Sequence, residues 1–181
     1  MFTETIRTGR LILRRLTRDD AAALHDSCSS DEAVVRFLTR GAASGPEETE
    51  KLVCSWVDSY ETADFFLWAI EFDGQVIGTV NLHGVCRASG RCEIGFSIGS
   101  RWWNRGIMTE AAGAVVRHAL DRLNFYQIIG WCAVGNAASA RVMEKIGMKK
   151  ANLPSQPVRL SSGEYADRIW YSIQREKEEA E

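Results

Sequence analysis

The fold is decided by the stretch Arg101-Trp102-Trp103-Asn104-Arg105-Gly106-Ile107-Met108-Thr109-Glu110-Ala111-Ala112, where the hydrophobic period of the chain changes. Upstream, residues 92–99 alternate between apolar and polar or small side chains, which is typical of a half-buried strand. Downstream, residues 108–123 repeat apolar side chains at i, i+3, i+4 and i+7, which predicts one buried helical stripe. The stretch is therefore predicted to lead from a strand through a short polar loop into a helix.

This junction has the physical properties of an anion site. The first backbone N–H groups of a helix have no intrahelical partners, and the aligned peptide dipoles place partial positive charge there. Gly106 lets the backbone approach an anion closely, and Arg105 can add charge at the rim. An ordinary turn whose free donors bind water would show the same residues, and the loop alone leaves both interpretations open.

Residues 103–111 resemble the acetyl-CoA pyrophosphate loop of the GNAT superfamily of N-acetyltransferases, and most of all its RimJ/RimL-type branch. The sequence departs from the superfamily pattern at Trp103, where Gln or Arg is usual, and at Met108, where Gly or Ala is usual. The resemblance implies that the loop binds the cofactor through Trp103, Asn104, Arg105, Gly106, Ile107, Met108 and Thr109.

A second segment supports this resemblance. Residues 136–148 are similar to the other GNAT signature, Asn-x-x-Ser-x-x-Val-x-x-Lys-x-Gly-Phe, with Met148 in place of the final Phe. The resemblance implies that Asn136 and Ser139 contact acetyl-CoA. Asn136 is also a good helix N-cap, and Ser139 can equally be read as a first-turn serine.

Acetyl transfer to an amine needs a base for the amine and an acid for the departing thiolate. Glu93 matches the glutamate of the branch motif Glu-Ile-Gly-Tyr-x-Ile and is the predicted base, although a strand-end glutamate can simply form a salt bridge. The tyrosine that many superfamily members use as the acid falls on Met143. Ser139 is the nearest hydroxyl, and a water or the low basicity of the thiolate is the alternative. Further cofactor contacts are expected along the pantetheine at Phe96, Ser97 and Ile98.

The remaining chain predicts further helices and strands. Helices are expected at 19–28 after the capping residue Thr17, at 31–38 capped by Ser29 or Ser30, from Pro46 to about Tyr60, and at 137–146. Strands are expected at 10–16, at 65–72 and 75–82 around an Asp73-Gly74 turn, at 92–99 after a turn at 87–90, and at 127–134, 148–150 and 165–173. Residues 152–163 are expected to form a loop, and 174–181 a frayed charged tail.

Together these elements predict one domain over residues 1–181 with a mixed α/β sheet. Because residues 127–134 follow the strand at 92–99 through a helix, the two strands should be parallel. The expected GNAT architecture has antiparallel N-terminal strands followed by a parallel pair splayed around acetyl-CoA, with helices on both faces. Trp56 and Tyr60 are expected to pack in the core rather than contact the acceptor.

Composition narrows the possible partners. The 181 residues carry a formal net charge of -2, which gives no general attraction to nucleic acid or to an anionic membrane. Five cysteines without a Cys-x-x-Cys pair and three scattered histidines suggest a reduced protein with no metal. Neither a signal peptide nor a membrane helix is recognisable, so a cytoplasmic location is expected.

The predicted function is acetyl-CoA-dependent N-acetylation of a primary amine. The branch resemblance implies a protein N-terminal α-amino group as the acceptor, with ribosomal proteins as the model. Two alternatives stay open: a small-molecule amine, such as a polyamine or an antibiotic, and a non-catalytic acyl-CoA-binding domain, which Met108 and Met143 suggest. The loops at 41–45 and 152–163 should select the acceptor, and the sequence leaves a homodimer open.

Overall fold

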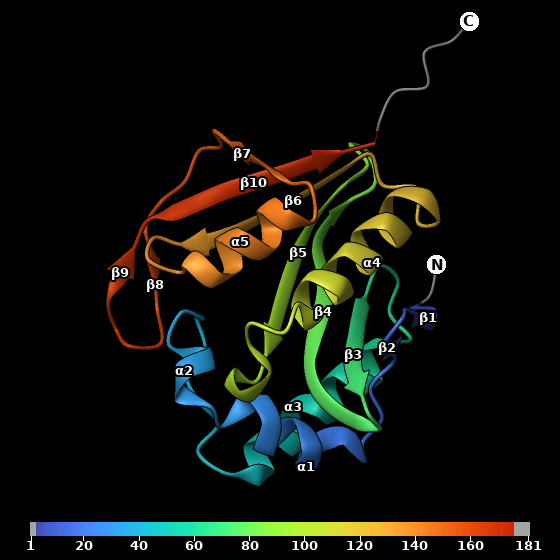
Figure 1. Cartoon of the computed structure of the whole chain (residues 1–181), viewed down its shortest axis with the longest axis vertical. Helices are drawn as coiled ribbons and strands as arrows, with labels where there is room; N and C mark the ends of the chain where they lie inside the picture. The colour runs from blue at the N-terminus through green and yellow to red at the C-terminus, as the bar shows by residue number, and fades with distance from the viewer. Residues whose placement is uncertain (1–2, 176–181) are drawn as a thin grey trace, which may run out of the picture.

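The computed structural model describes residues 3–175, which form one large mixed sheet covered by helices (Figure 1). Eight strands lie in the order β1-β2-β3-β4-β5-β6-β10-β7. Their bounds are Ile6–Arg7 (β1), Leu11–Arg14 (β2), Phe66–Phe72 (β3), Gln75–Cys86 (β4), Arg91–Ile98 (β5), Gln127–Ala133 (β6), Lys149–Ala151 (β7) and Arg168–Gln174 (β10). Strands β5 and β6 pair in parallel, and the other neighbours pair antiparallel.

Helices cover both faces of the sheet, as predicted. Their bounds are Asp20–Leu24 (α1), Glu32–Val35 (α2), Pro46–Ser59 (α3), Ile107–Asp121 (α4) and Ala137–Lys145 (α5), with a π-helical turn His25–Ser29 (η1) and a 3-10 turn Ser100–Trp102 (η2). Residues of α4 and α5 share one hydrophobic cluster, and residues of α1 and α3 share another on the opposite face. Within residues 3–175, no helix has the length and apolar character needed to cross a bilayer.

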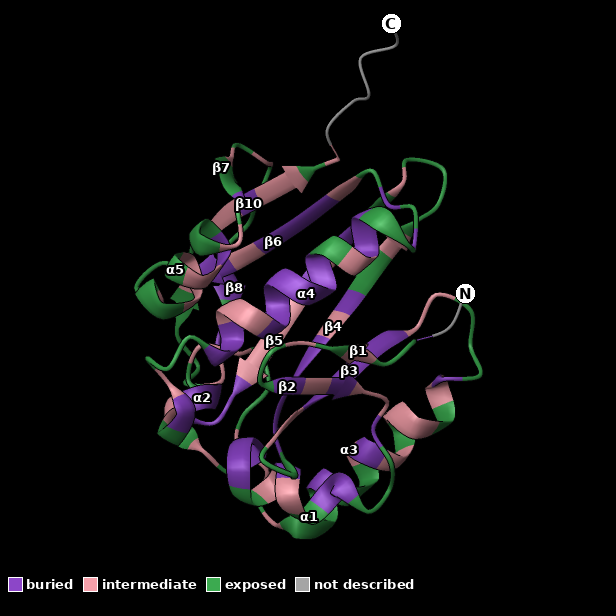
Figure 2. Cartoon of the chain, turned by 45° about the vertical axis from the view of Figure 1, so that its right-hand side comes forward, coloured by how far each residue is buried: buried purple, intermediate pink, exposed green. Residues whose placement is uncertain are grey.

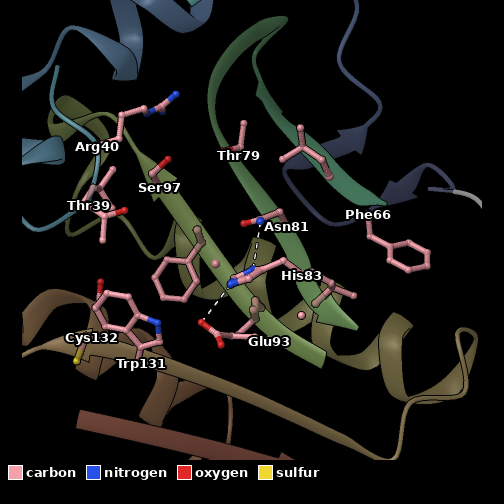
Figure 3. Close-up of a pocket in the computed structure, with 18 of the residues that line it drawn as sticks. Thr39, Arg40, Phe66, Thr79, Asn81, His83, Glu93, Ser97, Trp131 and Cys132 are labelled. Atoms are coloured by element: carbon pink, nitrogen blue, oxygen red, sulfur yellow. Dashed lines mark hydrogen bonds and ion pairs between the residues drawn. The ribbon is translucent and has the colours of Figure 1, made fainter. Parts of the chain in front are cut away.

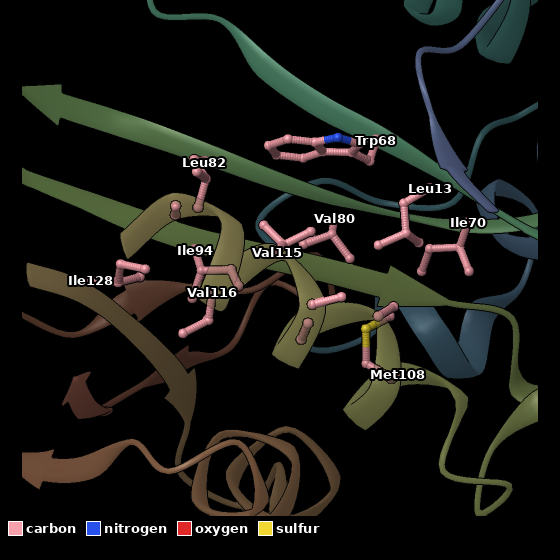
Figure 4. Close-up of a cluster of buried hydrophobic side chains, with 14 of the residues drawn as sticks. Leu13, Trp68, Ile70, Val80, Leu82, Ile94, Met108, Val115, Val116 and Ile128 are labelled. Carbon is pink, nitrogen blue, oxygen red and sulfur yellow. The ribbon is translucent and has the colours of Figure 1, made fainter. Parts of the chain in front are cut away.

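The main core lies between α4 and the centre of the sheet. Figure 2 shows buried residues along most of α4; they include the predicted stripe positions within the helix, and Gly113 and Ala114 extend the burial around it. Figure 4 shows the interdigitating side chains, among them Trp68, Ile70, Val80, Ile94, Val115, Val116 and Ile128. Burial of such aliphatic side chains stabilises a fold by about 1.5–3 kcal/mol each. This core fixes the start of α4 beside the end of β5.

The opposite core contains Tyr60, as predicted. The Tyr60 hydroxyl donates a hydrogen bond to the carbonyl of Leu67 at 2.8 Å and accepts one from the backbone N–H of Leu16 at 2.9 Å. Burial raises the pKa of Tyr60 to about 12. Tyr60 therefore ties α3 to two separate segments of the chain.

The β3–β4 hairpin is confirmed at its turn. Asp73 has φ 50° and Gly74 has φ 75°, and Phe72 pairs with Gln75 across them. Positive φ at both central residues gives the turn a twist that matches the twist of the flanking strands. The chain then returns through residues 87–90 into β5, which completes the predicted antiparallel meander.

The predicted capping residues of two helices are wrong, although the helices begin within one residue of the predicted positions. The cap of α2 is Asp31, whose carboxylate accepts the N–H of Ala33 at 3.0 Å, whereas Ser29 belongs to the π-helical turn and Ser30 donates its hydroxyl to the carbonyl of His25. At α1 the roles are reversed, because Asp20 accepts hydrogen bonds from Thr17 rather than being capped by it. A local pattern cannot tell which of several adjacent polar residues will cap a helix.

The C-terminal region is more structured than predicted. The expected loop at 152–163 contains β8 (Val158–Arg159), which pairs with β9 (Tyr165–Ala166), and the expected strand at 165–173 is divided at Asp167. Strand β10 includes Gln174, and the Arg175 guanidinium donates to the side-chain oxygen of Asn124 at 2.8 Å. The rest of the predicted frayed tail, 176–181, lies outside the described residues.

Replacing Asp20 by Asn is expected to destabilise the fold in a pH-dependent way. Asp20 receives two hydrogen bonds from the Arg14 guanidinium, both 2.8 Å long. Burial alone would raise the pKa of Asp20, but the bonds from Arg14 and Thr17 outweigh it and hold the pKa below its ordinary value. The stabilisation is therefore complete above about pH 4 and is lost as the pH falls through the folded-state pKa.

We expect Asp20→Asn to lower the free energy of unfolding by about 2–3 kcal/mol at neutral pH and by less at pH 3. Urea denaturation at both pH values measures the difference. The control is Asp58→Asn, which breaks a solvent-exposed pair with Arg18 and should cost less than about 1 kcal/mol. An equal loss for Asp20→Asn at both pH values would contradict the assignment.

Candidate active site

Strands β5 and β6 separate beside the start of α4. They pair only from Arg91–Gln127 to Glu93–Ile129, although both strands continue beyond this point. The separation opens a cavity of about 470 Å³, here called the loop cleft. Every predicted cofactor-binding residue except Arg105 lines it: Phe96, Ser97, Ile98, Trp103, Asn104, Gly106, Ile107, Met108, Thr109, Asn136 and Ser139.

The predicted anion cradle has the expected backbone geometry. Gly106 is the N-cap of α4 with φ 72°, and Asn104 has φ 60°. The first intrahelical hydrogen bond runs from the N–H of Glu110 to the carbonyl of Gly106 at 3.0 Å. The N–H groups of residues 107–109 therefore precede that bond and are available to an anion. The Trp103 indole N–H donates to the Ile98 carbonyl at 2.9 Å, which ties the loop to the end of β5.

An N-terminal segment supports the cradle from behind. The Glu110 carboxylate accepts hydrogen bonds from the Thr8 hydroxyl at 2.5 Å and from the Arg10 guanidinium at 2.7 Å. Burial would raise the pKa of Glu110, but these bonds outweigh it and keep the pKa below its usual value. Arg10 also donates to the carbonyl of Arg105 at 3.1 Å. Residues 8–10 thus fix both the loop and the first turn of α4.

The positive charge of the loop cleft comes from residues that sequence reasoning missed. The guanidinium of Arg105 lies over the Phe72 ring at 5.2 Å from its centroid, so it does not line the cleft. Arg36, Arg141 and Lys145 line it instead, and the described lining holds no carboxylate. Arg141 and Lys145 are four residues apart on α5, a spacing that could have placed them together. Arg36 follows α2 and gives no such signal.

A second cavity, here called the strand cavity, adjoins the loop cleft (Figure 3). Its volume is about 520 Å³, and its walls come from β3, β4, β5, β6 and the segment after α2. The two cavities share Phe37, Leu38, Phe96, Ser97, Asn136 and Ser139. A ligand in the loop cleft can therefore meet a ligand in the strand cavity at this shared wall.

Glu93 faces the strand cavity as part of a chain of polar groups. Its Oε1 lies 3.1 Å from the His83 Nε2, and the His83 Nδ1 lies 3.3 Å from the Asn81 amide nitrogen. Because the Asn81 nitrogen donates, Nδ1 accepts and Nε2 carries the proton toward Glu93. The side chain of Glu93 is 18% exposed and that of His83 is 48% exposed. This chain can hold a carboxylate in place and can receive a proton.

The place of His83 beside Glu93 was not predicted from the sequence. His83 and Glu93 are direct partners in the β4–β5 register, and Asn81 is two residues earlier on the same face. The sequence does show that Asn81 and His83 lie on the same face of their strand. It does not show that this face meets Glu93, because that depends on the register between the two strands. Trp56, predicted to lie in the core, also lines the strand cavity.

Asn136 and Ser139 lie at the shared wall as the resemblance implied. The Asn136 side-chain oxygen accepts the N–H of Ser139 at 3.2 Å, so the predicted cap is confirmed and the amide nitrogen remains available to the cleft. The Ser139 hydroxyl makes no hydrogen bond within residues 3–175. Met143 is 1% exposed, belongs to the main core and lines neither cavity.

Ser139→Ala is expected to separate two roles of this hydroxyl. If Ser139 only orients the cofactor, its loss should weaken CoA binding without a specific loss in the chemical step. If it donates a proton or a hydrogen bond to the thiolate, single-turnover transfer should slow by up to about 10²-fold, as for general acids. Direct CoA binding and rapid-quench transfer measure the two effects. If neither effect appears, Ser139 is only a serine at the start of the helix.

The fold and the two joined cavities define a class of protein. The site combines an anion cradle at a helix start, a slot between splayed parallel strands and a carboxylate at the adjoining cavity. This combination suits group transfer from an acyl-CoA thioester.

Comparison with known proteins identifies the family. Residues 10–149 match the model of the acetyltransferase (GNAT) domain, so the chain belongs to the GNAT family. YoaA of Bacillus subtilis, described as an uncharacterized N-acetyltransferase, is 27% identical over 175 residues, which cover 96% of this chain and 98% of YoaA. The ribosomal protein uS5-alanine N-acetyltransferase of Escherichia coli is 27% identical over 96 residues, which cover 52% of this chain and 49% of the relative.

The fold comparison agrees. RimL, a ribosomal L7/L12 α-N-protein acetyltransferase solved in complex with coenzyme A, superposes with a TM-score of 0.84 at 21% identity, over 94% of this chain and 98% of RimL. The GNAT fold and the resemblance to the RimJ/RimL-type branch are thus confirmed. The protein is an acetyl-CoA-dependent acyltransferase.

Proposed function

We propose that this protein acetylates the N-terminal α-amino group of a protein and that residues 1–181 act as a single domain. The observation that carries the proposal is the strand cavity, which opens beside the loop cleft and presents Glu93 to whatever enters it. Its volume of about 520 Å³ is in the range of sites that hold a ligand of several residues or rings. The similarity to the uS5-alanine N-acetyltransferase supports an N-terminal acceptor.

The loop cleft suits acetyl-CoA. We place the pyrophosphate on the amides of residues 104–109, with Arg36, Arg141 and Lys145 close enough to offset its charge and that of the other phosphate. The pantetheine would extend along β5 beyond Glu93, where that strand has no β6 partner, and would pair with its backbone as an added strand. Bound in this way, acetyl-CoA supplies the acetyl group as a thioester at the shared wall.

The residues of the strand cavity account for the proton transfers. Glu93 accepts a proton from the acceptor ammonium, directly or through one water, while His83 holds the carboxylate in place. The freed amine attacks the thioester carbon, the new C–N bond forms and the C–S bond breaks. The nitrogen then loses its second proton, which passes through Ser139 or a water to the departing thiolate, and Glu93 releases its own proton to solvent. Asn136 keeps Ser139 in position through the start of α5.

The structure also bears on the binding-domain alternative. Met108 is 7% exposed and packs in the main core, and Met143 is buried in the same core. Met143 therefore stands away from the site, and Met108 lies among the cofactor-binding residues of the loop cleft rather than beside Glu93. A cytoplasmic location remains part of the proposal, supported by the five free cysteines, which are typical of a reducing compartment.

A screen of acceptors tests the proposal. Acetyl-CoA is offered with ribosomal-protein N-terminal peptides, the same peptides blocked at the α-amine, polyamines and aminoglycosides, and thiol release is followed. We expect release with free peptides and none with blocked ones, with the added acetyl on the α-nitrogen by mass spectrometry. Turnover only with polyamines or aminoglycosides would assign a small-molecule acceptor, and no thiol release with any amine would contradict the proposal.

A further inference from the structure

Arg40 places an unpaired positive charge on the wall of the strand cavity. Its side chain lines this cavity but does not line the loop cleft. The guanidinium carbon lies 5.7 Å from the centre of the Trp56 ring, which holds it against the same wall. Within residues 3–175, Arg40 has no hydrogen bond or ion pair with a side chain. An anion that pairs with Arg40 must therefore belong to the acceptor and not to the cofactor.

The carboxylates around the strand cavity are already engaged. Glu93 contacts His83 at 3.1 Å, and Asp64 accepts a hydrogen bond from the Arg87 guanidinium at 2.9 Å. Glu48 lies near enough to Arg40 to interact through its charge, but its Oε2 accepts hydrogen bonds from the Ser44 N–H and hydroxyl at 2.8 and 2.9 Å.

Arg40 is exposed to solvent as a whole residue, but its guanidinium is partly desolvated, which disfavours an unpaired cation. Burial lowers the pKa of Arg40 below its ordinary value, and the charge of Glu48 does not offset this effect. A partly desolvated guanidinium gains from a carboxylate that can accept two parallel hydrogen bonds, since such charge-assisted pairs are stronger than neutral ones. The cavity therefore offers a site where an acidic group is stabilised and a basic one is repelled.

The two charges occupy different ends of the cavity. Figure 3 shows Arg40 beside Ser97, with Glu93 farther along β5 and its partner His83 on the neighbouring strand β4. Glu93 and Ser97 are four residues apart on this strand, which corresponds to about 13 Å. Ser97 belongs to the wall shared with the loop cleft, and the reacting amine must lie between this wall and Glu93. A carboxylate one to three residues from that amine is within reach of Arg40.

We propose that Arg40 selects acceptors that carry a carboxylate within the first three residues of the N-terminus. This inference rests on the proposed N-acetyltransferase function and defines its substrate class. The acidic side chain pairs with Arg40 while the α-amine meets the thioester at the shared wall.

Matched peptides test the inference. Each peptide carries Asp or Glu at position 1, 2 or 3, and its control carries Asn or Gln there, which keeps the size and removes the charge. For wild type we expect kcat/KM to favour the acidic member at one or more positions by at least about 10-fold, mainly through KM, and to fall for peptides with Lys. No preference at any position would overturn the inference.

Variants assign the preference to Arg40. Arg40→Gln should remove this preference by lowering kcat/KM for the acidic peptide about 10-fold relative to its matched neutral peptide, and Arg40→Glu should favour Lys peptides instead. Lys51→Gln is the matched control, because Lys51 lines a separate small cavity together with Arg40 but does not line the strand cavity. If Lys51→Gln removes the preference and Arg40→Gln does not, general charge attraction explains the result and the inference fails.

Failure of the inference is distinguishable from failure of the proposed function. Peptides that are acetylated without regard to charge would overturn the role of Arg40 alone. If free acidic amino acids are better acceptors than any peptide and Arg40→Gln removes that advantage, carboxylate recognition by Arg40 is supported and the peptide part of the proposal is overturned. Thermal melting confirms that each variant is folded before its kinetics are compared.

Discussion

Gly106→Pro is expected to weaken CoA binding by at least about 100-fold, the largest effect on affinity that we foresee for a single substitution. Gly106 has φ 72°, whereas proline fixes φ near −65° and removes a backbone N–H. The loop would have to leave the conformation that presents the amides of residues 107–109 to the pyrophosphate. Isothermal titration with CoA measures the loss directly.

Two further variants separate loss of the cradle from loss of the fold. Gly106→Ala adds only a methyl group, whose nearest neighbour would be the Arg10 guanidinium at 3.7 Å. The substitution strains the left-handed backbone, but it keeps the N–H group, so it should weaken CoA binding less than proline does. Gly74→Ala imposes comparable backbone strain at φ 75° in the β3–β4 turn, with nothing within 4 Å, and should leave CoA affinity unchanged. A folded Gly106→Pro protein that binds CoA normally would contradict the cradle.

Glu93→Gln is expected to lower turnover by about 10²–10⁴-fold, the usual contribution of general acid–base groups. The amide keeps the shape of the side chain but cannot take up the acceptor proton. The acidic limb of the pH–rate profile should flatten, because protonation of this carboxylate no longer controls the rate, while CoA affinity should stay nearly intact. Steady-state kinetics between pH 5 and pH 9 measure both effects.

The strand cavity provides a matched control for Glu93. Asp64 lines the same cavity and is paired with Arg87, so Asp64→Asn removes an equal charge without touching the Glu93–His83 contact. It should change turnover only modestly. His83→Ala should cause a smaller loss than Glu93→Gln, since His83 orients the carboxylate and does not replace it. Unchanged turnover in Glu93→Gln would transfer the role of base to a chain of waters.

Features set by neighbouring residues could be predicted from the sequence. The Asp73-Gly74 turn depends on two adjacent residues that accept positive φ, and the start of α4 depends on the change of period around Gly106. The Asn136 cap acts within one helical turn. Each of these features was predicted correctly because its physical cause is local.

Features set by contacts between distant segments could not be predicted in this way. Glu93 meets His83 only because the β4–β5 register places them opposite each other. The β8–β9 pair is held near α2 by Ser161, whose N–H donates to the Leu38 carbonyl at 2.8 Å and whose hydroxyl donates to the Val35 carbonyl at 2.9 Å. No short-range pattern carries such information.

Arg105 shows the opposite error. Its neighbours in sequence form the cradle, so a role in binding phosphate was a natural prediction, but its side chain leaves the loop on the other side and lies over Phe72. The direction of a side chain in a loop depends on the backbone angles around it, which the residue type does not reveal. Here Asn104 and Gly106, on either side of Arg105, both have a left-handed backbone.

The central claim is that cofactor and acceptor meet at the wall shared by the loop cleft and the strand cavity. A crystal structure with a bisubstrate conjugate, in which a peptide α-nitrogen is joined to CoA through the acetyl group, tests this claim most directly. The account predicts the pyrophosphate on the amides of residues 107–109 and the peptide nitrogen within hydrogen-bond reach of Glu93, directly or through one water. A conjugate whose pyrophosphate lies away from Gly106, or whose peptide leaves the strand cavity empty, would contradict it.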